Sequence, residues 1–398
     1  MATTDIITPW RERGPLFVIA GAHGSLHWAM AVFYLLLPFI KTEYGLSYTE
    51  IGLLTSVAHI SSFATNIPSG MIVDVTGRRM ECQLTALVLG GLAIVAIGWV
   101  SGFLALAAAI ALISSMNTLW HPAAISYLSA SFPNRRGMAL AFHTVGASLG
   151  DAAAPLAAGV LIAAIGWRDT AMLSGAFPIA AALLMLLVFG RRGPPTPVAG
   201  EPTSGVKSYF ADLGQLMRKA NTWTICIMAG FRSTSQTGIR TFLPLYFYAA
   251  FNPDPFMLGV LLMTLQASGA ATTPFAGAIS DKIGRRPILM AGFAGSAAFL
   301  LALPSITSLP VLVTLVGFAG IFIFAVRPVI QSWALDMTPP RLGGSITSLL
   351  FGTQSLFAIA VPIIGGVIAD RWGLEYVFYA LAGSIVVATL VSMTITDD

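Results

Sequence analysis

The chain has 398 residues, of which 10% are charged and 56% are hydrophobic. An ordinary soluble domain carries about 25% charged residues, and a soluble protein of this length has too much surface to cover with so few charges. The composition therefore excludes a soluble enzyme, a disordered protein and, with two cysteines, a disulfide scaffold, and it leaves an integral membrane protein.

Long stretches without charged residues predict transmembrane helices, each of which needs about 20 apolar residues. Residues 82–134 and 287–326 contain no Asp, Glu, Lys or Arg, and each stretch fits two helices with turns near 101–102 and 304–310. The stretches that fit one helix each are 15–40, 51–73, 137–165, 170–190, 223–250, 256–280, 344–369 and 376–395. The sequence therefore predicts an all-α integral membrane protein with twelve transmembrane helices.

Lys and Arg are distributed unequally between the two sides of the predicted membrane. Fifteen of them lie in the N-terminal tail and in the loops that follow even-numbered helices, whereas Lys41, Arg168 and Arg371 lie on the other side. Cytoplasmic loops carry the excess of Lys and Arg in membrane proteins. Both termini are therefore expected to be cytoplasmic, in a multi-pass protein of the bacterial inner membrane.

One long loop, residues 191–222, is rich in Pro, Gly and charge and is predicted to be a cytoplasmic linker. It separates residues 1–190 from residues 223–398, and each part is predicted to form a six-helix bundle. The two parts share a motif: GMIVDVTGRR at 70–79 returns as GAISDKIGRR at 277–286, between the second and third helix of each half. The distance between the two copies is 207 residues.

A second match supports this internal repeat. The dipeptide His121-Pro122 corresponds to Arg327-Pro328, at an offset of 206 residues. Two matches at nearly one offset indicate a parallel repeat, which is an architecture of transporters.

The duplicated Gly-x-x-x-Asp-x-x-Gly-Arg-Arg motif resembles the loop signature of the major facilitator superfamily, and the resemblance covers essentially the whole chain. It implies two six-helix bundles related by an axis along the membrane normal, a cavity lined by the first, fourth, seventh and tenth helices, and a monomer. The residues that resemble the fosmidomycin-resistance-like branch of bacterial facilitators are His23, His27, His121, Pro122, Arg135, Arg136, Gly137, His143, Gly146 and Gly150.

The loop motifs place carboxylates among arginines at helix ends, where they can pair and latch the cytoplasmic side. The resemblance implies a gating role for Asp74 with Arg135 or Arg136, and for Asp281 with Arg341 as the counterpart. The predicted gating residues are Asp74, Arg78, Arg135, Arg136, Asp281, Arg285 and Arg341.

Charged residues inside the predicted spans are functional candidates, because burying a charge in a membrane is costly. They are Arg232, Arg240, Arg327 and Asp151, so positive charge exceeds negative charge by about two. Arginine stays protonated and binds carboxylate or phosphonate groups in a bidentate manner, which predicts an anionic substrate. The predicted substrate-binding residues are Arg232, Arg327, Arg240, His23, His27, His121, Trp120, Tyr34, Gln236 and Gln331.

The histidines in the spans suit proton coupling, because the ordinary pKa of His is about 6.5. The predicted proton carriers are Asp151, His23, His121 and His143. His59 is expected to hydrogen-bond between helices. His23 and His27 also have the i, i+4 spacing of metal ligands, but no third carboxylate or thiolate accompanies them in sequence, and the arginines would repel a cation; we expect no metal.

The function predicted from these residues is proton-coupled transport of a small organic anion by alternating access, as a symporter. Alternatives are proton-driven drug efflux of the fosmidomycin-resistance type by antiport and, in other classes, a lipid flippase or a non-transporting membrane receptor. The sequence contains no nucleotide-binding loop and no catalytic or zinc-binding spacing, so we expect no enzyme activity, no cofactor and no nucleic-acid partner. The expected partners are the anion, protons and the lipid bilayer.

Overall fold

The computed structural model describes residues 10–190, 214, 216–339 and 342–395. The first half of the repeat consists of helices alone within these residues. They are α1 (Trp10–Tyr44), α2 (Tyr48–Thr76), α3 (Arg79–Trp99), α4 (Phe103–Ser131), α5 (Arg136–Ser174) and α6 (Ala176–Phe189), with a short 3-10 helix at Pro133–Arg135. The predicted linker falls mostly outside the described residues.

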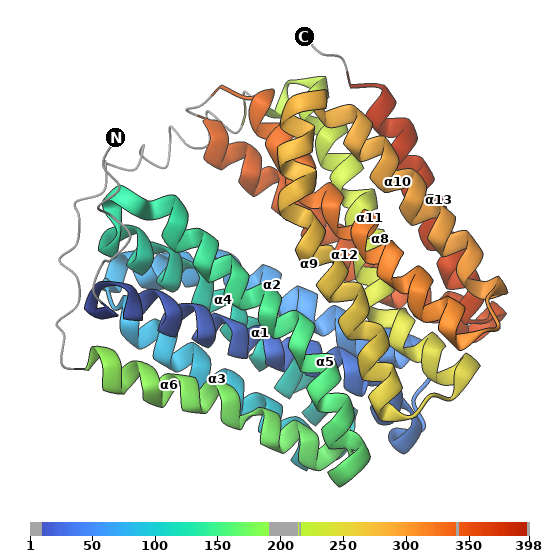
Figure 1. Ribbon diagram of the computed structural model, residues 1–398, viewed down its shortest axis with the longest axis horizontal. Coiled ribbons are helices and arrows are strands. Elements are labelled where there is room, and N and C mark those ends of the chain that lie inside the picture. Colours follow the sequence, from blue (N-terminus) through green and yellow to red (C-terminus); the bar gives the residue numbers. More distant parts are fainter. Residues whose placement is uncertain (1–9, 191–213, 215, 340–341, 396–398) are drawn as a thin grey trace. The chain divides into compact units, whose positions relative to one another are not determined.

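The second half repeats this order of helices (Figure 1). They are α8 (Ala220–Phe251), α9 (Pro255–Ile283), α10 (Arg285–Ala302), α11 (Leu309–Asp336), α12 (Gly343–Trp372) and α13 (Leu374–Met393), with a 3-10 helix at Leu303–Ser305. The described residues thus form twelve long α-helices, and the all-α prediction is confirmed.

The breaks between helices lie where glycine and proline predicted them. α3 ends at Trp99 and α4 begins at Phe103, after Gly102 with a φ of 96°. Within α5, Gly166 has a φ of 81° and kinks the helix between the two predicted spans. Only glycine adopts such backbone angles without steric cost, so these two positions interrupt the helices locally.

Most of these helices are apolar enough to cross a membrane. Nine candidate spans among the described residues meet the length and hydropathy criteria, and one of them joins α5 and α6. The helices α2 and α8 are less apolar and are not among the nine. α8 carries Arg232 and Arg240, so two predicted site residues contribute to its lower hydropathy.

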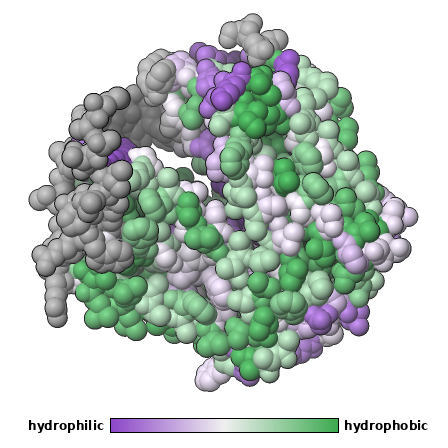
Figure 2. All heavy atoms as spheres, viewed as in Figure 1, coloured by the Kyte–Doolittle hydropathy of each residue, from purple (hydrophilic) through white to green (hydrophobic). Residues whose placement is uncertain are grey.

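The surface of the protein is apolar, as a lipid environment requires. Figure 2 shows hydrophobic residues over most of the visible face. The exposed fractions of Val75, Trp99, Leu104 and Leu187 are 82%, 81%, 82% and 76%. Large apolar side chains this exposed would aggregate in water, so they indicate contact with lipid.

Packing divides the chain into two compact units. The first comprises Met1–Phe33 and Ile60–Ala199, and the second comprises Tyr34–His59 and Gly200–Asp398. The C-terminal part of α1 and the N-terminal part of α2 therefore group with the second unit. The sequence-based prediction placed both segments in the first six-helix bundle. The predicted bounds, residues 1–190 and 223–398, stay a prediction.

Helix pairs inside the units follow the repeat. In the first unit α3 packs against α4 and α6, and in the second unit α10 packs against α11 and α13. α8 packs against α12 and α13, and in the first unit α1 approaches α5 through Gly24 and Gly146. Trp28 of α1 stacks on Phe177 of α6, with ring centroids 4.6 Å apart. Corresponding helices thus have corresponding neighbours.

The N-terminal end of α2 is held by a carboxylate of α12 inside the second unit. The Asp370 side chain accepts the backbone N–H of Tyr48 (2.9 Å) and of Thr49 (2.8 Å), and also the Thr49 hydroxyl (2.6 Å). An acid at a helix N-terminus satisfies free N–H groups and meets the positive end of the helix dipole. This contact explains why residues 48–59 pack with the second unit.

Small residues bring α1 and α5 into backbone contact. A Cβ on Gly24 would lie 2.7 Å from the Gly146 carbonyl oxygen, and a Cβ on Gly150 would collide with the backbone of Gly24. Small residues at helix interfaces in membranes allow such close approach, which takes the place of the hydrophobic driving force available in water. The approach places the histidines of α1 against those of α5.

Matched glycine substitutions in α5 test this packing. Gly150→Ala should lower the melting temperature, by an amount that corresponds to about 1–3 kcal/mol of overpacking. Gly137→Ala is the control, because a Cβ at Gly137 meets nothing within 4 Å and the gain in helix propensity is the same. Scanning calorimetry of both variants in detergent checks the prediction, and equal melting temperatures would contradict it.

Candidate functional site

Polar side chains inside the apolar helices form one group in each unit. In the first unit, four histidines and one carboxylate meet on three helices. His23 and His27 come from α1, His121 from α4, and His143 and Asp151 from α5. The sequence predicted all five as site residues, and the structure brings them together.

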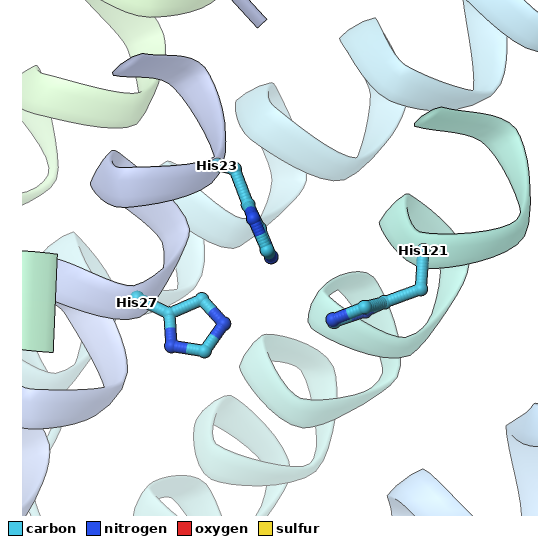
Figure 3. A group of neighbouring side chains, drawn as sticks. All are labelled: His23, His27 and His121. Carbon is cyan, nitrogen blue, oxygen red and sulfur yellow. The ribbon is translucent and has the colours of Figure 1, made fainter. Parts of the chain in front are cut away.

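The four imidazole rings contact one another directly around His23. The His23 ring stacks on His143 with centroids 3.7 Å apart and 14° between the planes. It meets His27 at 4.7 Å and His121 at 5.1 Å, both edge to face. Figure 3 shows His27 and His121 pointing toward each other beneath His23. His23 is 3% exposed, whereas His27 and His121 are half-buried.

Two hydrogen bonds and one ion pair orient three of these rings. The Nδ1 of His23 lies 2.7 Å from the backbone oxygen of His143, and the Nδ1 of His121 lies 2.8 Å from that of Asn117. The Nδ1 of His27 lies 3.2 Å from Oδ2 of Asp151. A carbonyl or carboxylate oxygen accepts only, so each Nδ1 carries the proton. The neutral form of each ring then has its lone pair on Nε2.

Trp120 fixes the fourth ring. Its Nε1–H donates to Nε2 of His143 at 3.1 Å, and the two rings are nearly parallel. Trp120 was predicted to contact substrate, but it is completely buried in this conformation, among apolar residues such as Leu26 and Leu128. The indole packs in the apolar core of the first unit. There it donates a hydrogen bond to His143.

In the second unit, guanidinium groups gather on α8 and α11. Arg232 is 4% exposed, and its Nη2 has no hydrogen-bond partner among the described residues. Arg232 and Arg327 line one small cavity of about 10 Å³ together with Gln331 and Gln354. The charged groups that act on Arg232 are Arg327 and Arg240, which are also positive. The predicted arginines therefore form one cluster.

Two further predicted residues surround this cluster. Gln236 lines a second small cavity with Arg232. Arg240 lies 6.0 Å from the ring centroid of Phe324 and within electrostatic reach of His59. His59 was predicted only to hydrogen-bond between helices, and its proximity to Arg240 was not predicted, because α2 and α8 are far apart in sequence.

The remaining predicted substrate residue, Tyr34, lies on the part of α1 that groups with the second unit. That the histidine cluster and the arginine cluster serve one substrate stays a prediction.

The duplicated loop motif forms an ion-pair cluster in its second copy. Arg285 pairs with Asp281 across the turn at Gly284 and donates from Nε to Asp336 at 2.9 Å and from Nη1 to Ser280 at 2.7 Å. Asp336, at the end of α11, was not predicted. It belongs to no motif of the sequence, and only folding brings it beside Arg285.

The first copy of the motif is built differently. Gly77 and Gly284 both have positive φ values, 64° and 94°, so both copies turn at the same glycine. In the first copy, the Thr76 hydroxyl accepts the backbone N–H of Arg78 at 3.2 Å. Arg341, the predicted partner of Asp281, lies outside the described residues. The gating roles of Asp74, Arg78, Arg135 and Arg136 stay predictions.

The contact between Trp120 and His143 makes a testable prediction. Trp120→Phe removes the N–H donor and leaves the buried Nε2 of His143 without it, which should cost about 1–3 kcal/mol of stability. Trp99→Phe is the control, because Trp99 is 81% exposed and should change stability by less than about 0.5 kcal/mol. Calorimetric melting curves measure both, and equal losses would show that the indole does not hold His143.

Comparison with known proteins gives relatives along nearly the whole chain. The chain is 24% identical over 360 residues to the fosmidomycin resistance protein of Escherichia coli (strain K12), covering 86% of this chain and 82% of that protein. It is 26% identical over 355 residues to the probable L-galactonate transporter of the same organism, covering 83% and 77%.

Solved structures and the family comparison agree. The fold is similar to the crystal structure of a bacterial homologue of the human lysosomal transporter Spinster, inward-facing and unoccupied, with a TM-score of 0.84, 17% identity and 98% of each chain covered. The sequence matches the Major Facilitator Superfamily over residues 19–248 and 225–398. The chain therefore belongs to the Major Facilitator Superfamily of membrane transporters.

Proposed function

We propose that this protein transports a small organic anion, of the carboxylate or phosphonate kind, across the bacterial inner membrane by alternating access. The observation that carries the proposal is Arg232, which is buried in a membrane helix with an Nη2 that has no hydrogen-bond partner among the described residues. A buried guanidinium keeps its charge and needs an anion close to it.

Like charges around Arg232 strengthen this argument. Its charged neighbours, Arg327 and Arg240, repel it, and the side chains that share its cavity with Arg327 include the neutral amides Gln331 and Gln354. A substrate carboxylate or phosphonate would accept hydrogen bonds from the guanidinium in a bidentate manner, while the amides would bind neutral polar groups. The cluster thus has the chemistry of an anion site.

The exposure of Arg327 supports access from water. Arg327 lies inside α11 (Leu309–Asp336), nine residues before its end, and its side chain is exposed. A charged side chain within a span faces protein or a water-filled cavity, because exposure to lipid is too costly. An anion in such a cavity would meet Arg327 before it reaches the buried Arg232.

The names of two relatives guide the choice of substrate class. The name of one relative refers to drug resistance and that of the other to a sugar acid, L-galactonate, which is a carboxylate. Uptake of an organic acid is the first proposal, and efflux of an anionic drug is the alternative, because one alternating-access cycle runs in either direction. The excess of Lys and Arg in the predicted cytoplasmic loops supports an orientation with both termini in the cytoplasm.

That protons drive the transport stays a prediction from the sequence. Protons carried by Asp151, His23, His121 and His143 would link transport to the membrane gradient. Substrate-driven acidification inside proteoliposomes, followed with a pH-sensitive dye, measures this coupling separately from binding.

Ligand-induced thermal stabilisation tests the anion site. Purified protein is melted with a panel of carboxylates, phosphonates and sulfonates, and with neutral and cationic drugs. An anion at 100 times its dissociation constant should add about 2.7 kcal/mol of stability. Arg232→Gln should abolish this shift, whereas Arg371→Gln, at an exposed position at the end of α12, should retain it.

Two outcomes would contradict the proposal. Stabilisation by neutral or cationic drugs, with no anion effective, would assign the arginines a structural role and favour multidrug efflux. An anion shift that survives Arg232→Gln unchanged would place the anion elsewhere.

A further inference from the structure

We propose that His23, His27 and His121 form a binding site for a divalent first-row transition-metal cation, with zinc as the best-suited ion. The sequence prediction of no metal rested on the lack of a third ligand near His27 and on repulsion by arginines. Folding supplies His121 from α4 as the third ligand, and it places the carboxylate of Asp151 3.2 Å from His27. The inference does not rest on the proposed anion, and a metal held by His23 and His121 would exclude these two residues as proton carriers.

The geometry of the three rings carries the proposal. One ring nitrogen from each residue lies within 4.8 Å of the others (Figure 3). Zinc binds imidazole nitrogen at about 2.0–2.1 Å in tetrahedral geometry, which places two ligand nitrogens about 3.3 Å apart. Ring rotations that move the nitrogens by about 1 Å would close this gap, and His27 and His121 are half-buried.

The contacts of the three Nδ1 atoms fix the tautomer and orientation that metal binding needs. The Nδ1 atoms of His23 and His121 hydrogen-bond to the backbone oxygens of His143 and Asn117, and that of His27 forms an ion pair with Asp151. The lone pairs therefore lie on Nε2, which is the nitrogen that a metal would take. Metal-binding histidines almost always donate their other N–H to a carboxylate or a backbone carbonyl, which fixes the tautomer and the ring orientation.

Two of the three Nε2 atoms, those of His23 and His27, are buried and have no hydrogen-bond partner among the described residues. A shared cation would accept both lone pairs and remove the penalty of leaving buried polar atoms without a partner. It would also remove the repulsion between lone pairs that converge. His143 is not a fourth ligand, because its Nε2 accepts from Trp120.

Charge and ligand type select the ion. Asp151 places a carboxylate behind His27, which holds the orientation of that ring and offsets part of the cation's charge. Three imidazoles suit zinc, copper, nickel and iron, whereas magnesium and calcium prefer oxygen ligands. Three protein ligands leave a fourth position open on a tetrahedral ion.

Cobalt(II) absorption tests the site, with the full-length protein purified through a tag that contains no histidine. One equivalent of cobalt should produce visible d–d bands, and zinc should displace it, whereas magnesium should not. His27→Gln and His121→Gln should each weaken cobalt binding by at least about tenfold. His59→Gln is the control, because His59 is a span histidine outside the cluster and should leave binding unchanged. Asp151→Asn should weaken binding about 10–100-fold.

Three results would overturn the proposal. Absence of cobalt bands in the folded wild-type protein, or bands that persist in both His27→Gln and His121→Gln, would exclude this site. Equal loss in His59→Gln would do the same. Melting curves confirm that each variant is folded. The assay contains no organic anion, so its outcome is separate from the test of anion transport.

Discussion

The cost of holding charge inside a membrane protein is the constraint on which the rest of the structure depends. Arg232 is buried beside other arginines, and water cannot solvate it fully. Under the proposed function, a transported anion would balance the charge of this cluster while it is bound. The exposed Arg327 gives this site a connection to water.

In the first unit, polar rings are packed closely together between the helices. Gly24, Gly146 and Gly150 let α1 and α5 touch, and this contact stacks His23 on His143. Trp120 completes the arrangement from α4. Since each ring is oriented by a polar partner, the lone pairs lie on defined nitrogens, and small ring rotations would bring those of His23, His27 and His121 to metal-ligand distances.

Much of the fold follows from local sequence signals. Long apolar stretches predicted the helices, and the turn near Gly102 was predicted as a break, because these signals act within a few residues. The duplicated motif identified the repeat. Contacts between distant segments were not predictable in this way. Asp370 at the α2 N-terminus, Asp336 beside Arg285 and the burial of Trp120 depend on tertiary packing, which periodicity does not encode. The charged residues inside the spans could be read from the sequence, whereas partners that come from distant helices could not.

The most direct measurement compares one carboxylate ligand with its neutral amide of the same shape by isothermal titration calorimetry. The two differ in charge and hardly in size, so the comparison isolates the demand of the buried arginines for an anion. If that demand governs binding, the amide should bind at least about 100-fold more weakly, a difference of about 2.7 kcal/mol. Equal affinity for the two ligands would contradict the central claim, because it would show that Arg232 and Arg327 do not recognise charge.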